Sequence, residues 1–355
     1  MGKPKISTKQ SRNIQKRHNQ LLNKNLEEPI DEASLGPLEE GIVISRFGKQ
    51  ADVEDSKTLK IYRTFIRRTI TSITTGDKVL YRVDTQHNDG NNGLIETLIP
   101  RTSLLSRPDF YDGLKPIVAN VTKILIVSAK IPEFSTNILD RYLIACENAK
   151  IEPIIVINKI DLFTNDEKEE LNKVLNVYKN LGYKYYIVSS KDNIGISELL
   201  DEIKNDTSVL VGQSGVGKSS LLNLLVPNAK ALTNDVSDNS GLGQHTTTNT
   251  KLYHINDTGI IIDSPGVREF GLWHLTNEEV TKCYREFQPF LGGCKFRDCK
   301  HLNDPGCAIV EAVKNGSIAE FRYNNYHKIL ESMAQNKPDA YVTPGKKYGK
   351  INDRN

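Results

Sequence analysis

The sequence predicts a multi-domain protein with an N-terminal OB-type β-barrel, a central α/β domain and a C-terminal α-helical domain around a metal site. Short β-rich runs separated by turns fill residues 39–115, and apolar strands alternate with amphipathic helices over residues 116–274. Residues 275–336 contain helical runs and four side chains of the types that ligate zinc. A length of 355 residues accommodates two or three domains of ordinary size.

The positive charge of the chain is concentrated at its N-terminus. Residues 1–24 contain seven lysines and arginines and no acid, whereas the remainder has 40 basic and 44 acidic residues. A segment so poor in apolar residues cannot bury a core, so we predict that residues 1–38 are a disordered basic arm that binds a polyanion. The alternative is a solvated tail that only aids solubility. Residues 337–355 are also polar and are predicted to be disordered.

Composition excludes several classes of protein. The longest apolar runs are far shorter than the ~20 residues that cross a bilayer, and no apolar signal segment follows Met1, so we expect a cytoplasmic protein that binds no membrane. The cysteines number five, and three of them lie between residues 294 and 307. This distribution argues against a secreted disulfide scaffold and favours a metal site.

The region assigned to the barrel has four β-rich runs, at residues 41–47, 60–69, 78–84 and 93–99. Barrels of this type often bind oligonucleotides on one face. Arg63, Arg67 and Arg68 would offer phosphate contacts on such a face. The alternative is that these arginines belong to an ordinary exposed surface.

The central region alternates strands and helices. Apolar runs at residues 121–129 and 153–158 are each followed by a helical pattern, and two further strands are expected near residues 185–188 and 208–211. This alternation predicts a parallel sheet covered by helices on both faces. Ligands of such sheets bind at the carboxyl ends of the strands, so we expect the binding and catalytic residues directly after each strand.

A phosphate-binding loop follows the strand that ends at residue 211. Its sequence, GQSGVGKSS, fits the pattern G-x-x-x-x-G-K-[ST] and precedes a helix, whose N-terminus adds positive charge. Lys218 is expected to reach the β and γ oxygens and to assist catalysis, and Ser219 to ligate magnesium. The residues assigned to phosphate binding are Gly212, Gln213, Ser214, Gly215, Val216, Gly217, Lys218, Ser219 and Ser220.

A second motif, at residues 158–161, indicates which base of a nucleotide the protein binds. Guanine presents adjacent N1–H and N2–H donors, and a carboxylate such as that of Asp161 only accepts hydrogen bonds. Adenine would leave this charge unpaired, so the motif favours guanine. Asn158, Lys159 and Ile160 complete the motif, and Ser189, Ser190 and Lys191 are expected to contact the other side of the base through backbone N–H groups.

The sequence Asp-Ser-Pro-Gly at residues 263–266 follows an apolar strand. Asp263 is expected to hold magnesium through water, and the Gly266 N–H to contact the γ-phosphate. Residues 238–248 resemble a switch segment in which Thr247 closes on magnesium when a triphosphate is bound. The base-reading motif precedes the phosphate loop, the reverse of its order in ordinary GTPases, so the central domain is predicted to be a circularly permuted α/β P-loop GTPase domain.

Hydrolysis also requires a group that orients the attacking water. Ras-like enzymes use a glutamine directly after the glycine of the Asp-x-x-Gly motif, but Val267 occupies that position here. His245 is the candidate for this catalytic role, because imidazole both accepts and donates hydrogen bonds near neutral pH. The alternative is that His245 contacts only solvent or RNA.

Four potential zinc ligands lie in the C-terminal domain: Cys294, Cys299, His301 and Cys307. Three thiolates and one imidazole form a closed tetrahedral set, which suits one structural zinc ion and leaves no open position for catalysis. Cys146 and Cys283 lie on helical patterns and are assigned to the core.

Taken together, these features resemble the bacterial RsgA (YjeQ) family of small-subunit ribosome biogenesis GTPases. The resemblance rests on the basic arm, on Thr75-Gly76-Asp77, on the order NKID, GQSGVGKSS, GQHTTT and DSPGVREFG, and on the Cys/Cys/His/Cys set. It implies a GTPase that binds the small ribosomal subunit and its 16S rRNA and hydrolyses GTP to GDP and phosphate late in subunit maturation. It also implies subunit-stimulated turnover, nucleotide-controlled rRNA binding, and GTP or GDP, magnesium and zinc as ligands. We expect the free protein to be a monomer.

Two other functions remain open at this point. One is an RNA-binding protein whose nucleotide is a structural or regulatory ligand with negligible catalysis. The other is a metabolic P-loop enzyme such as a small-molecule kinase, which is hard to reconcile with Asp161 and with three candidate RNA-binding surfaces.

Overall fold

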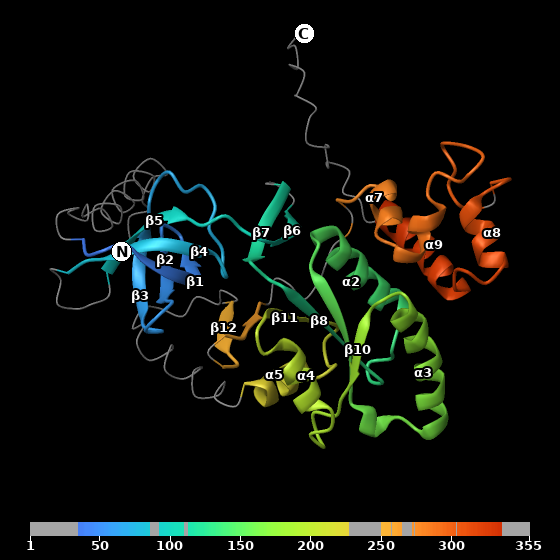
Figure 1. The fold of residues 1–355 in the computed structure, drawn as a ribbon, viewed down its shortest axis with the longest axis horizontal. Helices are drawn as coiled ribbons and strands as arrows, with labels where there is room; N and C mark the ends of the chain where they lie inside the picture. The colour runs from blue at the N-terminus through green and yellow to red at the C-terminus, as the bar shows by residue number, and fades with distance from the viewer. Residues whose placement is uncertain are drawn as a thin grey trace, which may run out of the picture.

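The computed structural model describes residues 35–85, 92–109, 113–226, 250–256, 258–264, 272, 274–302 and 304–335. A β-barrel, an α/β domain and a helical domain follow one another along the chain (Figure 1). Most of the predicted arm (residues 1–34) and the whole predicted tail (residues 337–355) lie outside the described residues. Among the described helices, none combines the length and the apolar character needed to span a bilayer.

A closed five-stranded barrel confirms the prediction for the N-terminal region. Its strands are β1 (Glu39–Phe47), β2 (Gln50–Asp55), β3 (Ile61–Ile66), β4 (Lys78–Val83) and β5 (Asn92–Leu98). They pair in the order β1-β2-β3-β5-β4, and only the β3–β5 pair is parallel. Strand β2 was not predicted, because its sequence QADVED is mostly polar. Its Ala51 and Val53 nevertheless alternate into the barrel core.

A two-stranded hairpin, β6 (Leu104–Asp109) and β7 (Gly113–Ala119), follows the barrel and was not predicted. Gly76 is essential to its junction with the barrel, because φ is +84° there and a Cβ would lie 2.3 Å from the Ala119 carbonyl oxygen. The neighbouring Asp77 is fully buried and accepts hydrogen bonds from Arg101 Nε (2.6 Å) and Nη2 (2.8 Å). The hairpin belongs to neither the barrel nor the larger sheet, so the predicted division at residue 115 stays a prediction.

The central sheet has six strands in the order β10-β9-β8-β11-β13-β12. Its strands are β8 (Lys123–Ala129), β9 (Glu152–Asn158), β10 (Lys184–Ile187), β11 (Thr207–Val211), β12 (Lys251–His254) and β13 (Ile260–Asp263). The first five in this order are parallel, as predicted, but β12 is antiparallel to β13. A short turn joins β12 to β13, and a connection this short can only reverse the chain.

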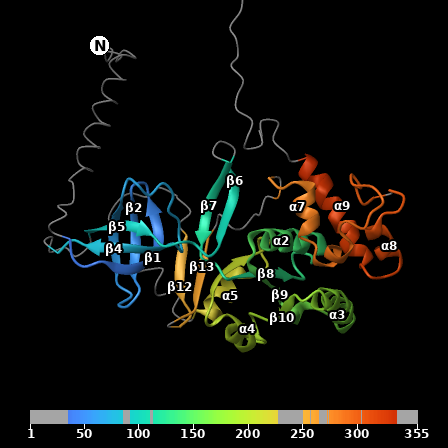
Figure 2. The same cartoon turned by 45° about the horizontal axis from the view of Figure 1, so that its top comes forward.

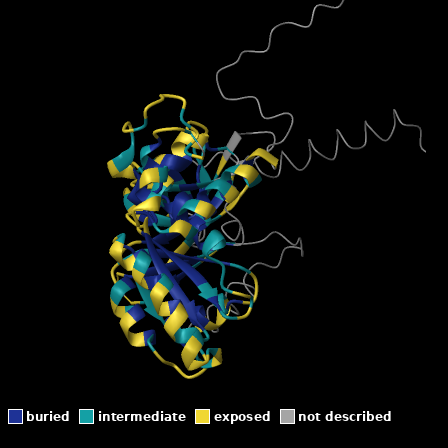
Figure 3. Ribbon diagram, turned by 90° about the vertical axis from the view of Figure 1, so that its right-hand side faces the viewer, coloured by how far each residue is buried: buried dark blue, intermediate teal, exposed yellow. Residues whose placement is uncertain are grey.

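Helices cover both faces of this sheet, and the strands between them are buried, as predicted (Figure 3). Ile124 and Ile126 face α2 and α3, whereas Leu125 and Val127 face α4 and α5. The helices are α2 (Thr136–Ala149), α3 (Asn165–Asn180), α4 (Ile196–Ile203) and α5 (Lys218–Leu225), with a short 3₁₀ helix, η2 (Ile160–Leu162), after β9.

The C-terminal domain is helical, as predicted. It consists of α7 (Asn277–Lys282), the 3₁₀ helix η4 (Arg285–Phe290), α8 (Ala308–Lys314) and α9 (Glu320–Gln335). Helix α7 is shorter than the helical pattern of residues 278–287, because Tyr284 has an extended backbone (φ −87°, ψ 109°) that separates α7 from η4. Cys283 is buried in this domain, and Cys146 is buried in the α/β domain, which confirms their assignment to the core.

A buried ion-pair network joins α9 to the α/β domain. Arg322 on α9 is 2% exposed and contacts both Asp140 on α2 and Glu286 on η4. Asp140 also accepts hydrogen bonds from Tyr178 Oη (2.7 Å) and Asn325 Nδ2 (2.7 Å). Charges removed from water are tolerated only when they are compensated in this way.

The network predicts that Arg322→Ala strongly destabilises the protein. Two buried carboxylates would lose their shared counter-ion, so we expect the free energy of unfolding to fall by about 3 kcal/mol or more in urea titrations. Lys282→Ala, which breaks an exposed ion pair with Glu278, is the control and should cost less than about 1 kcal/mol. Equal effects of the two substitutions would contradict the prediction.

Candidate functional site

The carboxyl ends of β9, β11 and β13 lie at one edge of the sheet and carry the predicted nucleotide-binding residues. Strand β9 ends at Asn158, β11 ends one residue before Gly212, and β13 ends at Asp263. Strands β11 and β13 are neighbours, and β8 separates β11 from β9. Motifs that lie about 100 residues apart in the chain therefore come together.

The phosphate loop has the backbone conformation that its glycines predict. Gly212, Gly215 and Gly217 have φ values of +138°, +85° and +96°, and a Cβ on Gly212 would lie 2.2 Å from the Val127 carbonyl oxygen. Helix α5 begins at Lys218, so Ser219 and Ser220 lie in its first turn. The free N–H groups of that turn give the loop its affinity for anions.

The lysine of the loop lies over the backbone of the loop itself. Lys218 Nζ donates hydrogen bonds to the carbonyl oxygens of Gly212 (2.7 Å) and Gln213 (2.6 Å). Its amino group is thus held beside the concave side of the loop, where an oxyanion would replace these carbonyls as the acceptor.

Asn158 connects the base-reading motif to the phosphate loop. Its side chain is fully buried, and Nδ2 donates to the Val216 carbonyl oxygen at 2.9 Å. Its Oδ1 accepts from the Ser190 backbone N–H at 3.0 Å. Lys159 adds a second connection, because Nζ donates to the carbonyl oxygens of Ile131 (2.9 Å) and Gly215 (2.6 Å). These bonds position three loops relative to one another.

Asp161 lies on η2 with a partly exposed carboxylate, and Ile160 beside it packs against the core. The Ser189 hydroxyl donates to Asp161 Oδ1 at 2.7 Å. This hydrogen bond, assisted by the nearby Lys191 and Lys159, lowers the pKa of Asp161 and keeps it ionised. An ionised carboxylate at this edge is suited to accept two adjacent N–H groups.

The loop at residues 189–191 is organised differently from the expectation that its backbone amides contact a base. The Ser189 N–H donates to the Ile194 carbonyl oxygen at 3.0 Å, and the Ser190 N–H donates to Asn158. The expected contact with a base therefore falls to the Lys191 amide. The Ser189 side chain has the positioning role at Asp161 described above.

The magnesium-binding and switch residues are only partly described. Asp263 ends β13, and the neighbouring Ser264 Oγ accepts a hydrogen bond from Thr250 Oγ1 at 3.1 Å. His245, Thr247, Gly266 and Val267 lie outside the described residues, so the roles assigned to them stay predictions.

Sequence reasoning missed an ion pair that supports the base-reading motif. Lys130 Nζ donates to the Leu162 carbonyl oxygen (3.0 Å) and to Glu167 Oε2 (2.6 Å), and Lys130 lowers the pKa of Glu167. Glu167 also forms a capping box with Thr164 at the start of α3. The Thr-x-x-Glu spacing was the available signal for this arrangement.

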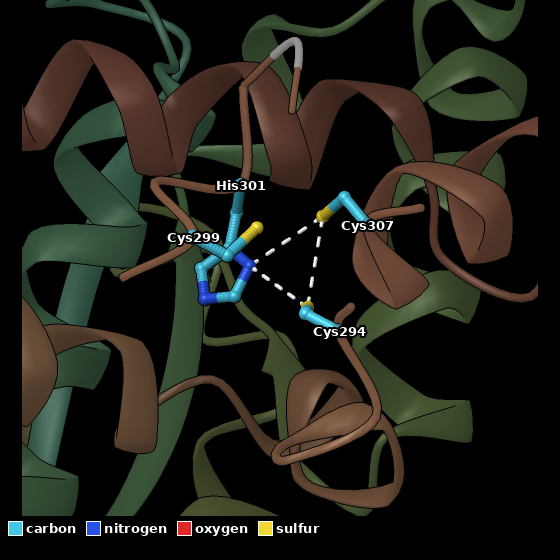
Figure 4. Close-up of side chains that lie close together, drawn as sticks. All are labelled: Cys294, Cys299, His301 and Cys307. Carbon is cyan, nitrogen blue, oxygen red and sulfur yellow. Dashed lines mark hydrogen bonds between the residues drawn. The ribbon is translucent and has the colours of Figure 1, made fainter. Parts of the chain in front are cut away.

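The four predicted zinc ligands converge in the C-terminal domain (Figure 4). Their ligand atoms all lie within 4.8 Å of one another. Cys294 Sγ and Cys307 Sγ are 3.9 Å apart, and His301 Nδ1 is 3.5 Å from each of them. In a tetrahedral site with Zn–S bonds of about 2.3 Å, the sulfur atoms are about 3.8 Å apart, so this donor set fits zinc.

The barrel arginines proposed for phosphate contacts have acidic partners. Arg63 pairs with Asp52, and Arg67 Nε lies 2.7 Å from Glu96 Oε2. These carboxylates offset the guanidinium charges and reduce their attraction for a phosphate. Arg68 is exposed. The structure therefore favours the alternative of an ordinary charged surface at Arg63 and Arg67.

Comparisons with known proteins agree with this geometry. The family model described as RsgA GTPase matches residues 98–273. The chain is similar to the small ribosomal subunit biogenesis GTPase RsgA 1 of Vibrio vulnificus strain YJ016, at 51% identity over 97% of this chain and 98% of the relative. It is also similar to small ribosomal subunit biogenesis GTPase RsgA of Proteus mirabilis strain HI4320, at 53% identity over 94% and 97%.

Two solved structures support the same assignment. YjeQ from Thermotoga maritima is 33% identical, with a TM-score of 0.68 over 84% of this chain and 99% of that structure. YloQ, described as a circularly permuted GTPase, is 30% identical, with a TM-score of 0.67 over 85% and 97%. The reversed motif order, the barrel and the Cys/Cys/His/Cys cluster are thus explained together: the chain belongs to the RsgA GTPase family.

Proposed function

We propose that this protein is a GTPase of small ribosomal subunit biogenesis, which hydrolyses GTP to GDP and phosphate late in subunit maturation. The observation that carries this proposal is that one edge of the sheet holds both the Asp161 carboxylate and the phosphate loop. Asn158 and Lys159, from the same motif as Asp161, donate hydrogen bonds to the phosphate loop, and Ser189 donates to Asp161. The relatives named above are described as GTPases of small-subunit biogenesis.

The residues at this edge are suited to GTP with magnesium. Asp161 accepts the N1–H and N2–H groups of guanine, and the phosphate loop with Lys218 holds the phosphates. Ser219 and Asp263 supply oxygen donors of the kind that magnesium prefers, and magnesium bound there would neutralise charge on the β and γ phosphates. His245 is proposed to orient the attacking water, with Thr247 and Gly266 contacting magnesium and the γ-phosphate.

The partner is proposed to be the small subunit through its 16S rRNA. The basic arm, the barrel and the C-terminal domain provide three surfaces for it, and the arm has the strongest net charge. Subunit binding is proposed to stimulate turnover, and the nucleotide state to set rRNA affinity. The free protein is proposed to be a monomer with domain divisions after residues 38, 115, 274 and 336.

Zinc is proposed to stabilise the C-terminal domain. The Cys294, Cys299, His301 and Cys307 donors form a closed set with no position left for a reacting water. Tyr323 Oη donates to the His301 carbonyl oxygen at 2.8 Å, so α9 contacts the cluster directly. Metal binding in such domains contributes folding free energy.

Base selection tests the proposal most directly. Asp161→Asn replaces one acceptor oxygen with an NH₂ donor, so GTP affinity should fall about 100-fold while XTP, which presents a carbonyl at C2, gains affinity. Isothermal titration calorimetry measures both constants. Asp166→Asn, a matched change at an exposed position on α3, should bind GTP normally. Unchanged discrimination against ATP and XTP in Asp161→Asn would refute the assignment.

Turnover tests the role of His245. We expect His245→Ala to lower subunit-stimulated phosphate release about 100-fold without changing GTP affinity, because only the transition state needs an oriented water. Phosphate release is measured with and without purified small subunits. Normal stimulation in this variant would remove His245 from the reaction, and no stimulation of the unmodified protein would favour a passive nucleotide-dependent RNA binder.

Zinc content tests the metal site. Purified protein should contain one zinc per chain by elemental analysis, and Cys307→Ser should lose the metal and the cooperative unfolding of the C-terminal domain. Cys283→Ser, which changes a buried thiol outside the cluster, should keep its zinc. Full zinc occupancy in Cys307→Ser would show that the cluster is not the site.

A further inference from the structure

Strand β12 pairs with β13 in a short antiparallel ladder. One end of this ladder lies at the nucleotide edge of the sheet, and the other end lies away from it. At the nucleotide edge, Lys251 pairs with Asp263, and Thr250 just before it is hydrogen bonded to Ser264. Three residues further along, His254 pairs with Ile260, which is the first residue of β13. A displacement of either end of this short ladder must therefore move the other.

At the far end of β12, a histidine is paired with a carboxylate of the barrel. His254 Nε2 lies 2.6 Å from Glu54 Oε1 on β2, and the two residues are 200 positions apart in the chain. The side chain of Glu54 is only 9% exposed and that of His254 is 25% exposed. In Figure 2, β12 lies beside the barrel, where it contacts β1. A carboxylate this buried is costly to leave unpaired, so the pair resists separation.

On the barrel side of this contact, Glu54 is held in place by strand pairing. Glu54 pairs with Ile42 on β1 and with Ile61 on β3, so it is held within the barrel wall on both sides. The next residue, Asp55, accepts hydrogen bonds from Thr58 Oγ1 (2.8 Å) and Tyr81 Oη (2.9 Å). Glu54 cannot move with β12 unless the barrel wall moves too, so a shift of β12 must either move the barrel or break the contact between Glu54 and His254.

We infer that Glu54 and His254 are positioning residues through which the barrel sets the place of the β12–β13 ladder, and with it Asp263, for GTP hydrolysis. The inference rests on the proposed function, because it requires Asp263 to act on bound GTP and the barrel to bind the subunit. RNA bound to the barrel would thereby act on Asp263 and on turnover. By thermodynamic linkage, the factor by which RNA changes GTP affinity equals the factor by which GTP changes RNA affinity.

Turnover measurements test this coupling. Glu54→Gln removes the charge with little change of shape, and we expect the ratio of subunit-stimulated to intrinsic turnover to fall about fivefold or more. Intrinsic turnover and GTP affinity should change by a smaller factor, because without the subunit no RNA bound to the barrel acts on the ladder. His254→Gln should have the same effect, and the double variant should be no worse than either single variant. Glu39→Gln, which removes a carboxylate of β1 that forms an ion pair with the exposed Lys57, is the matched control.

Hydrogen exchange tests the same coupling in the free protein. When a non-hydrolysable GTP analogue replaces GDP, amide protection should change together in β12 and β2, and in Glu54→Gln it should change in β12 alone. Full subunit stimulation of turnover in both single variants would overturn the inference. It would also be overturned if amide protection of β2 in the unmodified protein were the same with GDP and with the GTP analogue. Absence of subunit stimulation in the unmodified protein would instead refute the proposed function, and the exchange experiment would still decide the inference.

Discussion

The buried amide of Asn158 is the interaction on which the nucleotide site depends. It bonds at the same time to the phosphate loop through Val216 and to the 189–191 loop through Ser190. The fit around it is tight, because a Cβ on Gly217 would lie 2.3 Å from Asn158 Nδ2. One amide thereby holds together segments whose contacts span 58 and 32 residues of the chain, and a buried polar group of this kind favours a single arrangement.

Sheet topology explains why the reversed order of motifs leaves the site intact. The carboxyl ends of parallel strands meet at one edge whatever their order in the chain, so Asp161 can precede Lys218 without losing its place. The order of the motifs instead affects how the barrel and the C-terminal domain are attached to the α/β domain. The barrel reaches the sheet through His254 on β12, and the C-terminal domain reaches it through Arg322 on α9. Each additional domain thus contacts the α/β domain through a pair of side chains in which the carboxylate is largely buried.

These paired charges also account for how the basic residues are used. Arg63 and Arg67 in the barrel and Arg322 between domains are all neutralised by carboxylates, and their role is structural. The first 24 residues of the predicted arm, in contrast, include seven basic residues and no acid. Arg63 lies on β3 and Arg67 just after it, so the proposed attraction to a polyanion depends more on the arm than on these two arginines.

The sequence by itself determined the barrel, the α/β domain, the helical domain, the phosphate loop and the zinc ligands, because each leaves a local signature of periodicity or spacing. Strand β2 and the reversal of β12 were decided by tertiary structure: β2 is mostly polar, with only Ala51 and Val53 as apolar residues, and the direction of β12 depends on a short turn. The contacts of Asn158, Arg322 and Glu54 join residues far apart in the chain. No local sequence pattern predicts which partner a buried charge or amide will contact.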